Sequence, residues 1–365
     1  MKYLDEYRDG LRAEQLMARI RSVVTRRWVL MEVCGGQTHS LLKHGIEAGL
    51  QDVIELVHGP GCPVCVTPVE VIDHAQELAS QPGVTLCSFG DMLRVPGSES
   101  SLLQVRAQGG SVKLVYSPLE AVTFAQQHPD KQVVFFAVGF ETTAPATALA
   151  VLQTHQRALK NFSLLVHHVR VQPAMEAIMQ MPEVRVQAFL AAGHVCTVMG
   201  YDTYASFVER YRVPVVVTGF EPLDLLSGIL ECVKQLEAGT ALVVNEYARI
   251  VRPEGNLTAR QIVDQVYELT DQTWRGLGVI SQSGYRLKPA WHQYDAARRF
   301  PFRQPSCDET QSVCHAGEVL SGRMRPTNCP SFGTRCTPES PWGAPMVSSE
   351  GACAAYYRYR LPIIN

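Results

Sequence analysis

Short runs of β-branched and other apolar residues alternate with longer amphipathic stretches through the first two thirds of this 365-residue chain. Such runs are typical of buried strands, and the stretches between them are typical of helices. Strands are predicted at 28–33, 53–58, 84–89, 112–117, 133–140, 162–169, 188–195 and 213–220. Helices are predicted at 68–80, 118–128, 145–160, 173–180 and 202–211. The alternation indicates an α/β protein with mainly parallel sheets.

The same pattern suggests three parts. The first and second thirds each contain four predicted strands at similar spacing, and a polar QQHPDKQ segment near residue 130 separates them. After residue 285 the chain is rich in Pro, Gly, Ser and Cys, so it builds little apolar core, and a metal site would supply the missing stability. We expect two similar Rossmann-like α/β domains and a C-terminal iron–sulfur domain, at 1–130, 131–235 and 236–365.

Composition narrows the classes of partner. Hydrophobic residues make up 46% of the chain and charged residues 19%, as in ordinary globular proteins. The net charge is −2 and no basic stripe is present, so nucleic acid is not an expected partner. The N-terminus lacks the apolar core of a secretory signal, and no uncharged apolar run approaches the ~18 residues of a membrane span. We expect a cytoplasmic protein with no membrane segment.

Four of the eleven cysteines lie in the last fifth of the chain: Cys314, Cys329, Cys336 and Cys353. The cytosol keeps thiols reduced, so clustered cysteines there are more often metal ligands or redox groups than disulfides. These four are separated by 14, 6 and 16 residues and lack the paired CxxC knuckles of zinc ribbons, which favours an iron–sulfur cluster. Cys307 is a fifth candidate. Two disulfides or unrelated thiols are the alternative.

A second cysteine motif, VHGPGCPVC, places Cys62 and Cys65 where a strand should end and a helix should begin. A helix N-terminus lowers the pKa of a thiol, as in thioredoxin-type redox pairs. Redox or ligand chemistry is therefore favoured over half of a zinc knuckle or a packing pair. The remaining cysteines of the middle of the chain have apolar neighbours and are expected to be core residues: Cys87, Cys196 and Cys232.

A third motif, MEVCGGQTH, follows the first predicted strand. Two glycines after Cys34 allow close approach of a ligand to the backbone, and His39 lies five residues on. Cys34 and His39 could bind a transition metal or form a nucleophile pair, although a cysteine at a strand end is often only packed.

Polar residues also follow strands of the second third: Glu141, Thr142, Thr143 and His194. At strand ends they could face the cysteines across a cleft and supply proton transfer and hydrogen bonds. Helix capping is an equal alternative for the two threonines. His167 and His168 are expected to serve packing or surface roles.

Five motifs occur together in one order: CGGQTH (34–39), HGPGCPVC (58–65), GFETT (139–143), GHV (193–195) and the four-cysteine tail. In this combination the chain resembles the HypD family of hydrogenase maturation factors. The resemblance extends from DEYR (5–8) to EGACAA (350–355). Cys196 in GHVCTVMG departs from the family pattern, where serine is expected, and Cys307 lies outside the four-cysteine motif.

The resemblance implies a role in making the Fe(CN)2CO group of [NiFe] hydrogenases. The family acts as a redox-active assembly scaffold with a small partner, HypC, and receives cyanide delivered by HypE. It carries one [4Fe–4S] cluster, whose ligands match the four tail cysteines. Cys34 matches the cysteine that holds iron together with a cysteine of HypC, and Cys62 and Cys65 match a redox-active pair. The family also implies a chain that is monomeric alone and forms a heterodimer with HypC.

These roles give a mechanistic hypothesis. Cys34 holds iron, Cys62 and Cys65 cycle between dithiol and disulfide, and the tail cluster relays electrons to them. A runner-up hypothesis is an iron–sulfur-dependent thiol–disulfide oxidoreductase, which leaves Cys34 and GFETT without a role. A third is a zinc-stabilised binding module without redox chemistry.

Overall fold

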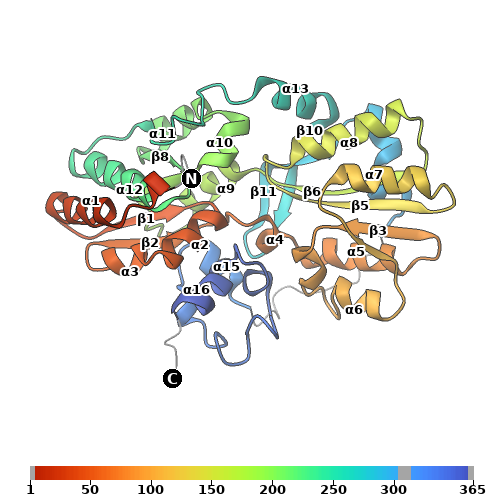
Figure 1. Cartoon of the computed structure of the whole chain (residues 1–365), viewed down its shortest axis with the longest axis horizontal. Helices are drawn as coiled ribbons and strands as arrows, with labels where there is room; N and C mark the ends of the chain where they lie inside the picture. Colours follow the sequence, from red (N-terminus) through yellow and green to blue (C-terminus); the bar gives the residue numbers. More distant parts are fainter. Residues whose placement is uncertain (1–4, 303–313, 361–365) are drawn as a thin grey trace.

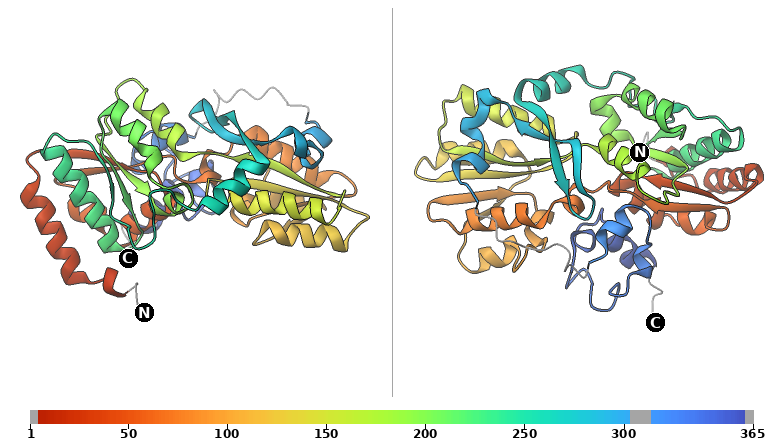
Figure 2. Two further views of the ribbon diagram at one scale, coloured as in Figure 1. Left: turned by 90° about the horizontal axis from the view of Figure 1, so that it is seen from above. Right: turned by 180° about the vertical axis from the view of Figure 1, so that it is seen from behind.

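Two parallel β-sheets form the body of the molecule, and a C-terminal segment packs beneath the region where they meet (Figures 1 and 2). The computed structural model describes residues 5–302 and 314–360. We refer to residues 314–360 as the cysteine segment, because they contain the four tail cysteines. The predicted Cys307 lies outside the described residues.

Sheet A has the strand order β2-β1-β7-β8-β9, and every neighbouring pair in it is parallel. Its strands are β1 (Trp28–Glu32), β2 (Ile54–His58), β7 (Ala188–Ala192), β8 (Val215–Thr218) and β9 (Val243–Asn245). Sheet B has the order β4-β3-β5-β6 and is also parallel. Its strands are β3 (Val84–Ser88), β4 (Val112–Leu114), β5 (Gln132–Gly139) and β6 (Phe162–His168).

The predicted fold class is confirmed: the protein is α/β with mainly parallel sheets, and each of the eight predicted strands is present. Both sheets place their first strand between the second and the third, which is the order of doubly wound folds. Alternate residues of β5 point into different cores, with Phe135 in one and Phe136 in the other. Both faces of sheet B are therefore buried, which explains its continuous apolar runs.

Strand pairing differs from the expected division near residue 130. β3 and β5 lie on opposite sides of that point in the sequence, yet they are neighbours in sheet B. β1 likewise pairs with β7, which comes more than 150 residues later. The chain leaves sheet A after β2, builds sheet B, and then returns. Hydrophobic pattern shows where strands are but not which of them pair, because a parallel crossover can have any length above about a dozen residues.

Helices cover both faces of each sheet (Figure 1). Those before β5 are α1 (Gly10–Val23), α2 (Gly35–Lys43), α3 (Ile46–Leu50), α4 (Pro63–Val66), α5 (Val69–Ser80), α6 (Leu102–Ala107) and α7 (Pro118–Gln127). Those after it are α8 (Ala144–Gln156), α9 (Val171–Met179), α10 (Gly193–Met199), α11 (Ala205–Tyr211), α12 (Pro222–Glu237), α13 (Leu257–Val266), α14 (Ala296–Arg299), α15 (Ala316–Leu320) and α16 (Ala352–Arg360). The predicted helices overlap α5, α7, α8, α9 and α11.

An antiparallel hairpin that the sequence pattern did not predict lies at the centre of the molecule (Figure 1). It consists of β10 (Tyr267–Trp274) and β11 (Gly278–Leu287). Arg170, just after β6, donates its backbone N–H to the carbonyl of Ser283 at 2.8 Å. Trp274 is fully buried and donates its indole N–H to the Ser283 hydroxyl at 2.9 Å. The hairpin is thus fixed to the carboxyl end of sheet B.

Helix length and hydropathy bear on the membrane question. Across residues 5–302 and 314–360, no helix combines the length and the apolar composition that crossing a membrane would require.

Candidate thiol and metal site

Cys34 lies at the point where the strand order of sheet A reverses. It ends the connection from β1 and is the residue before α2, while His194 is the second residue of α10, directly after β7. Because β1 and β7 are neighbours, the Cys34 Sγ atom comes within 3.7 Å of His194 Nδ1. Ligands of doubly wound sheets bind at this switch point, so the topology by itself marks Cys34 as a functional position.

The surroundings of Cys34 are dry. Burial raises the pKa of the Cys34 thiol, and burial lowers the pKa of His194 to about 4. At neutral pH the imidazole of His194 is therefore neutral, and it can accept the thiol proton or orient a ligand bound to the sulfur. Phe220 packs against His194, with 5.3 Å between the ring centroids, and closes this side of the site.

A buried carboxylate holds the backbone of Cys34. Glu32 accepts the Cys34 backbone N–H at 2.7 Å, and its other oxygen accepts hydrogen bonds from the Thr38 hydroxyl and from His58 Nδ1, the latter at 2.8 Å. Burial lowers the pKa of His58, but hydrogen bonds and charge from Glu32 and Glu47 outweigh that effect and raise it to about 9. His58 is therefore an imidazolium between two buried carboxylates at neutral pH.

The same network reaches the cysteine segment. The Tyr356 hydroxyl, on α16, donates to Glu47 at 2.8 Å and lies 3.1 Å from His58 Nε2. Cys353 is three residues before Tyr356 on that helix. The backbone around Cys34 and the helix that carries Cys353 are thus joined through buried side chains.

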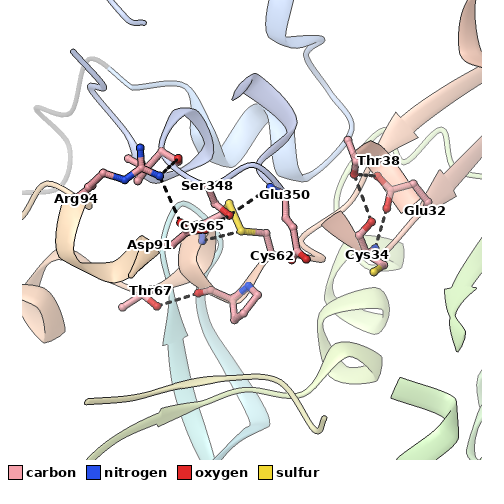
Figure 3. Close-up of a disulfide and its surroundings, with 12 residues drawn as sticks. Glu32, Cys34, Thr38, Cys62, Cys65, Thr67, Asp91, Arg94, Ser348 and Glu350 are labelled. Carbon is pink, nitrogen blue, oxygen red and sulfur yellow. Dashed lines mark hydrogen bonds and ion pairs between the residues drawn. A yellow bond between two sulfur atoms is a disulfide. The ribbon is translucent and has the colours of Figure 1, made fainter. Parts of the chain in front are cut away.

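Cys62 and Cys65 form a disulfide at the start of α4 (Figure 3). Both residues are buried, and the Cys65 backbone N–H donates to Cys62 Sγ at 3.3 Å. The motif lies directly against CGGQTH, because the Gly35 N–H donates to the Gly61 carbonyl at 3.0 Å. A Cβ atom at Gly61 would overlap the backbone of Cys34, so only glycine permits this approach.

The cysteine segment covers both motifs. A Cβ atom at Gly35 would overlap the carbonyl of Glu350, and Figure 3 shows the Glu350 side chain between the disulfide and Cys34. Desolvation and the charge of Asp91 raise the pKa of Glu350. The Ser348 hydroxyl donates to Asp91 at 2.8 Å, which ties this stretch to the loop after β3.

The four tail cysteines line one small cavity, together with Phe332, Trp342 and Gly343. A side chain at Gly343 would overlap Cys314 Sγ, so this glycine leaves room beside the thiol. Burial raises the pKa of Cys353, and the charges of the other three cysteines raise it further. Within the described residues, no three His, Cys, Asp or Glu side chains converge closely enough to bind a single metal ion. The four thiols surround a space rather than a point.

Not every predicted site residue lies beside the thiols. His39 faces the cysteine segment: its Nε2 lies 3.2 Å from the Tyr359 hydroxyl and its Nδ1 3.4 Å from the Ser349 carbonyl. The histidine beside Cys34 is His194 instead. His39 therefore helps to seat α16.

The GFETT residues lie at the carboxyl end of β5. Burial raises the pKa of Glu141 to about 7, and its Oε1 accepts the Val171 backbone N–H at 3.0 Å. Thr143 contacts His168 at 3.1 Å, and Thr142 is half-buried in the turn before α8. Within the described residues, neither Glu141 nor Thr142 forms a hydrogen bond or ion pair with the motif cysteines.

Sequence reasoning missed four residues that hold the site: Glu32, Glu47, His58 and Tyr356. A signal was available for two of them. Glu32 interrupts an otherwise apolar strand, and His58 opens the HGPGCPVC motif, and charged residues are rarely buried unless they are paired. The pairing with Glu47 and Tyr356 depends on tertiary structure.

The chain matches known proteins over nearly its whole length. The family model "HypD: Hydrogenase formation hypA family" matches residues 12–360. The hydrogenase maturation factor HypD of Azotobacter vinelandii is 48% identical over 98% of this chain and 97% of its own length. The HypD protein of Escherichia coli strain K12 is 44% identical over 99% of this chain and 98% of its own length. The hydrogenase expression/formation protein HupD of Azotobacter chroococcum is 46% identical, with 98% and 97% covered.

Fold and site together define a doubly wound α/β protein with a switch-point thiol, an adjacent disulfide and four further cysteines around one cavity. The comparisons make this class specific. The chain belongs to the HypD family of hydrogenase maturation factors.

Proposed function

We propose that this chain is the scaffold on which the Fe(CN)2CO group of a [NiFe] hydrogenase is assembled, in complex with HypC and with cyanide supplied by HypE. The observation that carries the proposal is the convergence of three thiol groups: Cys34, the Cys62–Cys65 disulfide beside it, and the cysteine segment that covers both. Residues from distant parts of the sequence meet here. We place this chemistry in the cytoplasm, with the chain monomeric until it binds HypC.

The donor set of the cysteine segment fits a [4Fe–4S] cluster. Each iron of a cubane takes one thiolate, so four thiols spaced around a cavity suit it better than thiols that converge on one ion. Cys314, Cys329, Cys336 and Cys353 would hold the cluster, and Gly343 leaves room beside Cys314. When bound, such a cluster would supply single electrons close to α4.

Cys34 suits the role of iron anchor. Low-spin iron with cyanide and carbonyl ligands requires a soft thiolate donor, and Cys34 offers one in a dry site. Burial disfavours the free thiolate, so the sulfur gains its negative charge only when a cation arrives to balance it. Neutral His194, 3.7 Å away, can accept the proton that the thiol then releases. The cysteine of HypC would supply the second sulfur.

The disulfide gives the electron count for cyanide delivery. Cleavage of a thiocyanate, R–S–CN + 2e⁻ + H⁺ → R–SH + CN⁻, consumes two electrons. Oxidation of the Cys62 and Cys65 dithiol to the disulfide releases two electrons and two protons. One proton remains for the surroundings, and each later reduction of the disulfide again requires two electrons.

The runner-up, a thiol–disulfide oxidoreductase for protein substrates, fits the structure less well. Cys62 and Cys65 are buried beneath the cysteine segment, so another protein could not reach the disulfide unless that segment moved. The Cys34–His194 pair would also have no role in that reaction.

Infrared spectroscopy of the chain co-purified with HypC tests the scaffold role. Cyanide and carbonyl stretching bands are expected for the wild-type complex and should be lost in Cys34→Ala, while the visible absorbance of the cluster is retained. Cys232→Ala is the matched control, since Cys232 is an equally buried free thiol in α12. Unchanged cyanide bands in Cys34→Ala would show that the anchoring role is wrong.

A further inference from the structure

The tip of the β10–β11 hairpin lies between α4 and the cysteine segment. Arg275, the first residue of the tip, donates its backbone N–H at 2.8 Å to the carbonyl of Val66, the residue after Cys65. Gly276 packs backbone to backbone against Gly317, with a φ of +75°, and a Cβ on it would lie 2.6 Å from Gly317 Cα. Gly317 follows Cys314 by three residues. The tip therefore contacts the disulfide helix on one side and the start of α15 on the other.

Arg275 also places a positive charge inside this junction. The residue is 9% exposed, and its guanidinium Nη2 donates to the Pro96 carbonyl at 3.1 Å. Burial raises the pKa of the Cys314 thiol, and the charge of Arg275 opposes that rise. A guanidinium removed from water loses several kcal/mol of hydration, so a buried arginine indicates negative charge or strong acceptors nearby.

The junction holds few fixed negative charges but many sulfur atoms. Trp274 and Leu277 of the hairpin pack in the same core cluster as Cys62, Cys65 and Val66. Reduction of the disulfide, or of a metal centre held by Cys314, adds negative charge to this core. In a site with little water, a cation stabilises such charge over several ångströms with weak screening.

We propose that the hairpin tip couples the Cys62–Cys65 pair to the cysteine segment, with Arg275 as the positioning residue that favours the reduced state of the pair. This inference rests on the proposed function only for the identity of the electron donor. The placement of Arg275 against α4 and Cys314 does not depend on which metal centre the cysteines bind. Because a cation that stabilises the reduced form makes a disulfide more oxidising, loss of Arg275 should make the pair harder to reduce.

The first experiment uses the full-length chain without metal, under anaerobic conditions. The protein is equilibrated with dithiothreitol redox buffers, the thiols are trapped by alkylation, and the reduced fraction of Cys62 and Cys65 is measured by peptide mass spectrometry. In Arg275→Gln the equilibrium constant for reduction should fall at least tenfold, which corresponds to about 30 mV for a two-electron couple. Arg275→Lys keeps the charge and should stay within threefold of wild type.

Arg286→Gln is the matched control. It removes the same charge from the same hairpin, but Arg286 is exposed and pairs with Glu268 at 2.8 Å, away from the junction. Its equilibrium constant should stay within twofold of wild type. An Arg275→Gln protein that is folded, by circular dichroism, and also within twofold of wild type would overturn the role of Arg275.

A second experiment tests the contact with α15 and needs no change of charge. Gly317→Ala places a methyl group against the Gly276 backbone and should push the tip and α15 apart. Reconstitution with iron and sulfide should shift the disulfide equilibrium of wild type at least fivefold and that of Gly317→Ala less than twofold. Equal shifts in the two proteins would overturn the coupling, and this arm decides if Arg275→Gln does not fold. A wild-type chain that binds no iron would contradict the proposed function instead, and the metal-free measurement would still decide the role of Arg275.

Discussion

At the scale of single residues, His58 is the group whose charge matters most for the stability of sheet A. Its pKa rises from an ordinary value of 6.5 to about 9 in the folded protein, because Glu32 and Glu47 outweigh the effect of burial. A raised folded pKa contributes stability that is fully present below pH 6.5 and is lost as the pH rises through 9. We expect wild type to lose on the order of 3 kcal/mol of unfolding free energy over this range that His58→Gln does not lose.

Urea unfolding at pH 6 and pH 9.5 would measure this difference. His128→Gln is the control, because His128 ends α7 at the edge of sheet B and is remote from the Glu32 network. Parallel losses of stability in wild type and in His58→Gln would contradict a charged His58.

Cys196 shows why a thiol near the site need not belong to it. The residue is fully buried, and burial raises the pKa of its thiol to about 12. We therefore expect no alkylation of Cys196 by iodoacetamide in the native protein at pH 8, and complete alkylation in urea, by peptide mass spectrometry. Cys196→Ser should keep the cyanide bands, because Tyr204 lies close enough to hydrogen-bond either side chain. Native labelling at the rate of a free thiol would contradict the burial of this group.

At the scale of elements, the start of α2 depends on which of its two glycines is changed. A Cβ at Gly35 would overlap the backbone of Glu350, whereas at Gly36 the nearest atoms belong to the Phe220 ring, 3.3 Å away. Backbone cannot yield as a ring can, so Gly35→Ala should separate α2 from the cysteine segment and Gly36→Ala should not. We expect Gly35→Ala to lose at least half of its bound iron, measured by metal analysis, and about 2 kcal/mol of stability. Equal iron content in the two variants would show that the contact does not matter.

Elements also show how far the sequence could predict this fold. The buried strands were predictable because they are continuous apolar runs, as in β5. The hairpin was not, because β10 alternates irregularly between polar and apolar residues and follows α13 without a turn between Val266 and Tyr267. Its strands contact other elements on one side only, so no strong apolar pattern marks them. The hairpin tip is nevertheless what separates the disulfide helix from α15.

At the scale of the whole molecule, topology decided what sequence reasoning could not. Cys34, Cys62 and Cys65 were predicted to lie near one another from strand-end positions alone. The partner of Cys34 was left open between His39, which is near in sequence, and residues of the second third. The pairing of β1 with β7 brings His194 to Cys34, while His39 points to Tyr359. Such pairings depend on strand order, which hydrophobic pattern does not encode.

Glu141 lies where elements from both sheets pack together. Its carboxyl is buried and raised in pKa by desolvation, and only the charge of Arg170 and hydrogen bonds with backbone groups oppose the rise. Groups that feel its charge are Cys196 and Tyr204 beside sheet A and Tyr285 on the hairpin. Ionisation of Glu141 therefore places a poorly compensated negative charge between the two halves of the molecule.

The sign of the pH effect follows from these surroundings and is opposite to a salt-bridged carboxylate. The folded pKa is about 7 against an ordinary value of 4.5, so folding favours the protonated form, and stability is lost as the pH rises from 4.5 through 7. We expect Glu141→Gln to be more stable than wild type at pH 8 by on the order of 2–3 kcal/mol and nearly equal to it at pH 4.5. Urea unfolding at the two values measures this, with Glu77→Gln, on α5 of the same sheet, as the control. A stability difference that does not change with pH would mean that Glu141 is ionised throughout, with a partner that forms only when the protein is at work.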